Sequence, residues 1–230
     1  MPYISDDLLL VYVKEVLAAA KVADTNENIH KNVIDPFSAL FDAMRQDIPL
    51  DKWLAQEKMR QTQKSLQNAL GDFHHKVIGH MPGWEYLATG GGYDVKCVSK
   101  KIIAEIKNKF NTMNSGKSLE VYDTLSKYLD YDRTHKNYTA YIVHIVPRAP
   151  EGYDRPFVPS DRGTQRRERG DIRVIDGRSF YEKATGNANA LRNLYLRLPD
   201  ILAKITGSHP EKTLNSPTFK ELFERAYDPA

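Results

Sequence analysis

The order of apolar and polar residues predicts a chain of helices interrupted by a few strands. Near the amino terminus, leucine, valine and alanine recur at helical spacing, and Ser5 or Asp6 is a suitable cap. A long amphipathic stretch further on keeps the same period until Gly79, which ends it. We expect helices over residues 6–22, 36–44, 50–78, 119–131, 179–184, 188–198 and 200–205, and a last helix that begins at Ser216-Pro217.

Strand patterns lie between these helices. Residues 90–107 read as two short strands joined by a turn at residues 99–101, and residues 138–146 form a β-branched and aromatic run typical of a central strand. A third short strand is expected over residues 172–175, after a long loop at residues 148–169 that is rich in proline, glycine and arginine. The pattern predicts an α/β (α+β) fold with a central mixed sheet flanked by helices.

Length and composition limit the class of protein. A chain of 230 residues with 41% hydrophobic residues allows one domain or at most two small ones, and we expect one domain over residues 1–230 with helical additions at residues 1–49 and 188–230. The single cysteine, Cys97, excludes an intramolecular disulfide. Without a signal peptide or a membrane-spanning run, we expect a soluble, intracellular protein that has no membrane partner.

Candidate chemistry lies in the predicted hairpin. Because strand side chains alternate, Glu105 and Lys107 project from the same face of the second strand. Asp94, at the start of the first strand, can come close to both of them. Two carboxylates and a lysine that meet at a sheet edge can hold a divalent cation and activate water against a phosphodiester. We expect Asp94, Glu105 and the Ile106 carbonyl to be the metal ligands, whereas the alternative is an exposed Glu–Lys face on an ordinary strand.

Two further groups of residues could extend this site. Asp72, Glu57 and Glu85 are candidates for a fourth acidic group, and Asp72 is preferred because its helical turn is nearest the hairpin. The histidines at positions 74, 75 and 80 also fall nearby, but a zinc site needs four ligands at recognisable spacing. We therefore interpret these histidines as helix-surface or capping residues.

The net charge of +3 is too small to indicate a nucleic-acid partner, but the arginines are unevenly placed. Eight of the fourteen arginines lie in residues 148–178, which contain no lysine. Arginine reads guanine with two hydrogen bonds, and a carboxylate can accept from cytosine, so this composition suits contact with a G·C-rich DNA. The alternative for each arginine is a local salt bridge on a solvated loop. We expect DNA contacts from Lys109, Lys117, Arg162, Gln165, Arg166, Arg167, Arg169 and Arg173.

Five stretches of the sequence together resemble a known family. They are residues 70–79, Gly83-Trp-Glu, Gly91-Gly-Tyr-Asp94, residues 101–109 and residues 173–182. These stretches are similar to type II restriction endonucleases of the PD-(D/E)XK superfamily, in particular to the family that cuts GGNCC or GGWCC sites. One departure is Tyr93, which stands where the superfamily motif has proline.

The resemblance implies the catalytic residues, the cofactor, the substrate and the oligomeric state. Asp94, Glu105 and Lys107 would be the catalytic residues, Mg²⁺ the cofactor and double-stranded DNA the substrate. The enzyme would act as a homodimer on a short pseudopalindrome and leave 5′ overhangs. It would work in the cytoplasm of a prokaryotic cell, beside a cognate DNA methyltransferase. Two alternatives stay open: a repair or junction-resolving nuclease of the same fold, and a non-enzymatic DNA-binding protein.

Overall fold

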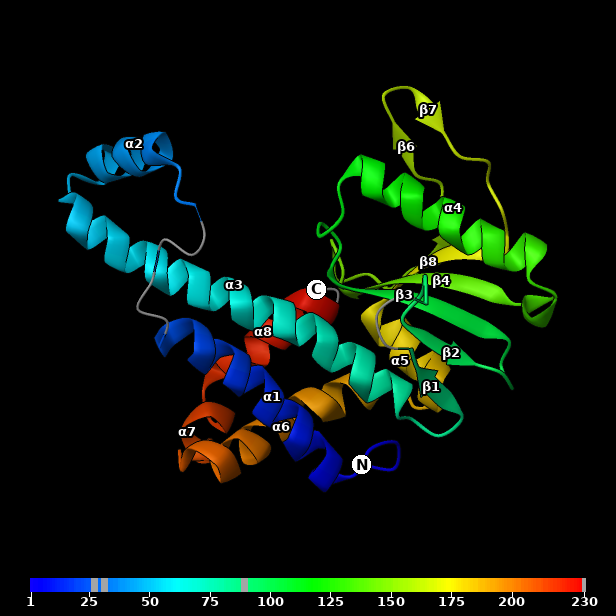
Figure 1. The fold of residues 1–230 in the computed structure, drawn as a ribbon. Coiled ribbons are helices and arrows are strands. Elements are labelled where there is room, and N and C mark those ends of the chain that lie inside the picture. Colours follow the sequence, from blue (N-terminus) through cyan, green and yellow to red (C-terminus); the bar gives the residue numbers. More distant parts are fainter. Residues whose placement is uncertain (26–28, 30–32, 88–90, 229–230) are drawn as a thin grey trace. The chain divides into compact units, whose positions relative to one another are not determined.

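A computed structural model describes residues 1–25, 29, 33–87 and 91–228 (Figure 1). The chain forms two compact units, one made of Met1–Tyr12 and Gly71–Ala230 and the other of Val13–Leu70. Helices α1 (Asp6–Thr25) and α3 (Leu50–Gly79) contribute residues to both units. The prediction of a single domain over residues 1–230 stays a prediction.

The smaller unit has its own apolar cluster. Helix α2 (Pro36–Gln46) begins after Asp35, whose carboxylate caps the helix by accepting from the Phe37 N–H. Its buried residues Ala39 and Ala43 pack with Trp53 of α3. The Trp53 indole N–H also donates to Asp42 at 3.0 Å, so the indole has both an apolar and a polar partner.

The larger unit is built on a six-stranded mixed sheet. The strands are β1 (Trp84–Tyr86), β2 (Val95–Cys97), β3 (Ile102–Lys109), β4 (Thr139–Val146), β8 (Ile172–Asp176) and β5 (Asp154–Pro156), in that order across the sheet. The central strands β3, β4 and β8 run parallel, and the other pairs are antiparallel. The central strands are buried on both faces and are therefore rich in isoleucine, valine and alanine.

Helices cover the two faces of this sheet (Figure 1). Helix α4 (Ser115–Tyr131) packs Val121 and Leu125 against Ile103 and Ile142. On the other face, Phe180 of helix α5 (Gly177–Thr185) contacts the rings of Trp84 and Tyr141. This two-sided cover is the expected environment for a sheet with a parallel centre.

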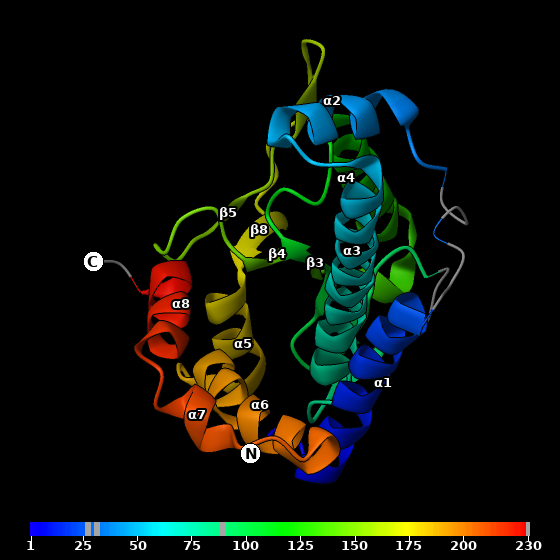
Figure 2. The same ribbon diagram turned by 90° about the vertical axis from the view of Figure 1, so that its left-hand side faces the viewer.

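Three more helices follow α5 and pack in succession (Figure 2). They are α6 (Ala190–Thr206), α7 (Pro210–Leu214) and α8 (Pro217–Tyr227). The Tyr195 and Phe219 rings stack at 4.5 Å between centroids, and the Tyr227 hydroxyl donates to the Ile145 carbonyl at 2.9 Å. The carboxyl-terminal helices are thereby tied to strand β4. No helix among the described residues is long and apolar enough to cross a membrane.

The structure confirms the mixed α/β class and the predicted hairpin, which turns between Val98 and Lys101. One prediction of two helices was wrong, because residues 190–206 form the single helix α6 with a buried Pro199 inside it. Proline removes one intrahelical hydrogen bond, but here packing keeps the helix continuous. The expected loop at residues 148–169 contains β5 and a separate two-stranded hairpin, β6 (Ser160–Asp161) with β7 (Thr164–Gln165).

Candidate active site

Asp94 directly precedes β2, and its backbone is hydrogen-bonded to residues on both sides. Its N–H donates to the Ala104 carbonyl and its carbonyl accepts from the Leu87 N–H, both at 2.9 Å. The Asp94 carboxylate also accepts from the Ile106 N–H at 2.6 Å. These three bonds leave little freedom for the carboxylate, which is turned toward strand β3.

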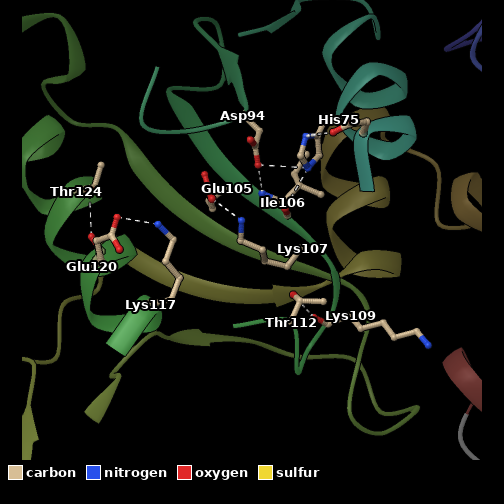
Figure 3. A network of polar contacts seen from close by, with 11 residues as sticks. His75, Asp94, Glu105, Ile106, Lys107, Lys109, Thr112, Lys117, Glu120 and Thr124 are labelled. Carbon is tan, nitrogen blue, oxygen red and sulfur yellow. Dashed lines mark hydrogen bonds and ion pairs between the residues drawn. The ribbon is translucent and has the colours of Figure 1, made fainter. Parts of the chain in front are cut away.

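Glu105 and Lys107 lie on the face of β3 that α4 covers (Figure 3). Ile103, two residues before Glu105, is in the apolar core under α4, so alternation directs Glu105 and Lys107 to the same side. The Lys107 Nζ donates to the Glu105 carboxylate at 2.5 Å. Both side chains are largely buried, with exposed fractions of 22% for Lys107 and 15% for Glu105. The expected group of three residues is therefore brought together.

A cavity of about 430 Å³ opens beside this group. Asp94 and Glu105 line it from the sheet, and Lys117, Glu120 and Thr124 line it from α4. Burial raises the pKa of Asp94, and the neighbouring Glu105 carboxylate raises it further. Three other groups lower the pKa of Asp94: His75, the Ile106 N–H and Lys107. A buried carboxyl beside a second carboxylate in one cavity forms a site suited to a cation.

His75 is the site residue that the sequence interpretation missed. Its Nε2 lies 3.1 Å from the Ile106 carbonyl oxygen and 3.5 Å from the Asp94 carboxylate (Figure 3). Because a carbonyl oxygen only accepts, Nε2 carries the proton in this contact. The prediction of a helix-surface or capping histidine is thus wrong at position 75. Its distance of 31 residues from Ile106 explains why no local pattern could reveal the contact.

The other acidic candidates differ in position. Asp72 is 70% exposed, lines the same cavity and lies 4.0 Å from His75 Nδ1. Glu57 belongs to the smaller unit, where it pairs with Arg60 at 2.5 Å. Glu85 is an exposed residue of β1. Of the three, Asp72 is the one that lines the cavity beside Asp94 and Glu105.

The donor set fits a hard divalent cation that is only partly held by protein. Among the described residues, no three His, Cys, Asp or Glu side chains converge as a complete metal cage. Mg²⁺ needs fewer protein ligands, because it keeps several waters and binds substrate phosphate. The Asp94 and Glu105 carboxylates supply oxygen donors, and the Ile106 carbonyl has a second lone pair besides the one that faces His75.

The expected DNA-contact lysines lie on different sides of the site. Lys117 pairs with Glu120 at 2.7 Å on the first turns of α4 and lines the same cavity as Asp94 and Glu105. Lys109, at the end of β3, is exposed and points away from the carboxylates in Figure 3. Lys117 is therefore the one adjacent to the catalytic group.

Three of the expected DNA-contact arginines are paired with carboxylates of the same chain. Arg166 binds Asp123 through two hydrogen bonds of 2.7 Å. Arg169 bridges Asp130 and Asp171, and Arg173 binds the carboxylate and the carbonyl of Asp154. Arg162, Gln165 and Arg167 are exposed, and among the described residues their side chains have no recorded polar partner.

The six-stranded mixed sheet with helices on both faces is consistent with a restriction-endonuclease fold. Residues 1–207 match the model of the Eco47II restriction endonuclease family. The chain is 37% identical to the type II restriction enzyme Eco47II of Escherichia coli, over 99% of this chain and 98% of that enzyme. It is 29% identical to the type II restriction enzyme Sau96I of Staphylococcus aureus, over 87% and 78% of the respective chains.

The chain therefore belongs to the Eco47II restriction endonuclease family, and it is a type II restriction endonuclease.

Proposed function

We propose that this enzyme cuts double-stranded DNA at a specific site in a Mg²⁺-dependent reaction catalysed by Asp94, Glu105 and Lys107. The observation that carries the proposal is the convergence of these three part-buried side chains: Asp94 and Glu105 line one cavity, and the Lys107 ammonium group donates to Glu105. Two carboxylates can hold a divalent cation, and the adjacent lysine adds a positive charge for the phosphate, so together these groups suit phosphodiester hydrolysis.

The Asp94 and Glu105 carboxylates and the Ile106 carbonyl would hold Mg²⁺, with Asp72 as an additional acidic group at the cavity rim. When bound, the ion supplies charge stabilisation at the phosphate and makes water more acidic. His75 would orient the Ile106 carbonyl through its Nε2–H. Burial and then the nearby Glu105 carboxylate raise the pKa of Asp94, and this supports the assignment because a cation would stabilise both carboxylates in their charged form.

Lys107 would act on the charge that grows at the scissile phosphate. Its ammonium group is fixed by Glu105 and is poorly solvated, so its field at the phosphate is stronger than in water. Water attacks phosphorus, the bond to the 3′ oxygen breaks, and that oxygen takes up a proton. The products are a 5′-phosphate and a 3′-hydroxyl.

The wider assignment rests on the similarity to restriction enzymes. We propose a homodimer, because two copies related by a two-fold axis can each cut one strand of a symmetric site. The target would be a short G/C-rich pseudopalindrome of the GGNCC or GGWCC kind, and the cuts would leave 5′ overhangs. DNA contacts would come from Lys109, Lys117 and the arginine-rich loop. A cognate methyltransferase would protect the host DNA in the cytoplasm of a prokaryotic cell.

Two substitutions in the catalytic group test the proposal. We expect Glu105→Gln and Lys107→Ala each to lower the cleavage rate roughly 10²- to 10⁴-fold, because the first removes a carboxylate that would hold Mg²⁺ and the second removes the positive charge near the reacting phosphate. Gel-shift assays without Mg²⁺ should show DNA binding largely retained. The matched controls Glu151→Gln and Lys100→Ala, both at exposed positions, should cut at the wild-type rate. Normal cleavage by either catalytic variant contradicts the assignment.

A further inference from the structure

The hairpin of β6 and β7 projects past α4, away from the sheet (Figures 1 and 2). Its strands pair Ser160 with Gln165 and Asp161 with Thr164. The two turn residues, Arg162 and Gly163, have positive φ values of 46° and 81°. Positive φ at both central positions is what a tight type I′ hairpin turn requires. The strained Arg162 backbone therefore places a guanidinium at the tip of a two-stranded ribbon.

The base of this hairpin is fixed to α4 by ion pairs. Arg166 follows β7 directly and binds Asp123, and Arg169 binds Asp130, seven residues further along α4. Residues seven apart lie on the same face of a helix, so the two pairs clamp the segment along one side of α4. The Tyr122 hydroxyl adds a hydrogen bond of 2.5 Å to the Arg167 carbonyl. Arg166 and Arg169 are thus engaged in holding the hairpin in place.

Two side chains further out on the hairpin are not paired with α4. Arg162 and Gln165 are exposed, and within the described part of the chain neither side chain has a recorded hydrogen bond or ion pair. Arginine at an unpaired position can bind guanine O6 and N7, glutamine can bind adenine, and serine or threonine can contact either purine or pyrimidine. The Arg162 and Gln165 side chains therefore take no part in the contacts that hold the hairpin to α4, and they are available to a ligand.

We propose that the β6–β7 hairpin enters the major groove of the DNA and reads base edges with Arg162 and Gln165, while Arg166 and Arg169 anchor it to α4. The major groove admits a two-stranded ribbon, and the exposed groups of this ribbon suit base recognition. This inference rests on the proposed function, because it assigns the specificity of the same cleavage reaction. Arg167, exposed at the base of the hairpin, contacts the phosphate backbone beside the groove.

Helix α4 links this recognition element to the catalytic cavity. Its first turns carry Lys117 and Glu120, which line the cavity, and its middle and end carry Asp123 and Asp130, which hold the hairpin. One rigid helix therefore sets the distance between the bases that are read and the phosphate that is cut. A fixed distance of this kind is what cleavage at a defined position requires.

The test begins with wild-type enzyme, whose cut site is mapped on phage DNA in Mg²⁺. Duplex oligonucleotides are then made with that site and with each single base-pair substitution in it. We expect Arg162→Ala to cut the intact site roughly 10- to 100-fold more slowly and to lose discrimination at one base-pair position of each half-site, because both protomers carry the substitution, with discrimination at the other positions retained. Gln165→Ala should lose discrimination at a different base-pair position. Arg162→Lys should not restore discrimination, because lysine lacks the two-pronged donor.

The controls separate recognition from folding and from phosphate binding. Melting temperatures of Arg162→Ala and Gln165→Ala should match the wild type, since neither side chain has a recorded polar contact. Equal slowing on every duplex would indicate phosphate contacts and overturn the assignment, as would an unchanged discrimination profile. If the wild-type enzyme produces no discrete fragments at all, the proposed function fails, and this outcome is distinct from failure of the hairpin assignment.

Discussion

At the scale of single residues, the position of Asp94 depends on Gly92. Gly92 has a φ of 72°, and a Cβ at this position would lie 2.6 Å from Cε2 of Tyr128. The Tyr128 ring cannot move aside easily, because it packs against the rings of Tyr93 and His135. Gly92 is thus required both by its backbone conformation and by close packing, two residues before Asp94.

We predict that Gly92→Ala lowers the free energy of unfolding by about 2–5 kcal/mol, combining left-handed strain with overpacking. Gly186→Ala is the matched control, because Gly186 has a φ of 74° and a Cβ added there would have no neighbour within 4 Å. The free energy of unfolding of this control should fall by only about 1–2 kcal/mol. Urea unfolding of both variants measures the difference, and equal losses would contradict the packing argument.

The residues of the catalytic group differ in how well the sequence predicts them. Glu105 and Lys107 follow from alternation along one strand, and the turn at residues 98–101 brings Asp94 opposite, since Val95 pairs with Ala104. His75 and its contact with Ile106 could not be predicted, because a helix surface gives no sign of which distant strand it will meet. The sequence predicts geometry within one strand or hairpin, whereas contacts between distant segments can be identified only once the fold is known.

At the scale of elements, the β6–β7 hairpin was not predicted because its four strand residues are polar and show no apolar alternation. Helices α1, α2 and α3 were predicted close to their observed limits, because long amphipathic periods are local signals. Helix α4 begins at Ser115 rather than at Leu119, since Asn114 caps it by accepting from the Lys117 N–H. The β6–β7 hairpin is held in place by ion pairs to α4 and not by burial of apolar side chains.

We predict that Asp123→Asn loosens the hairpin, because it removes the charge that binds Arg166 through two hydrogen bonds. Brief digestion of the folded enzyme with trypsin should then cut after arginines 162–169 several-fold faster than in the wild type. Glu211→Gln, at an exposed position on α7, is the control and should digest at the wild-type rate. Unchanged digestion of Asp123→Asn would show that the clamp does not order the loop.

At the scale of the whole molecule, the class of fold was predictable, but the order of its strands was not. The β-branched run at residues 138–146 indicated a central strand, and β4 indeed lies between β3 and β8. The order β1-β2-β3-β4-β8-β5 depends on crossovers through α4 and past the arginine-rich loop, which no local pattern fixes. These crossovers carry the polar groups that line the cavity and support the hairpin.

The most direct test of the central claim is incubation of the purified enzyme with unmethylated phage DNA, in parallel with Mg²⁺ and with EDTA. We predict discrete, reproducible fragments with Mg²⁺ only, and sequencing of their ends should give one short G/C-rich site with 5′ overhangs. Fragments in EDTA would contradict the metal assignment. A smear in Mg²⁺ would contradict site specificity, and intact DNA in both tubes would contradict the nuclease itself.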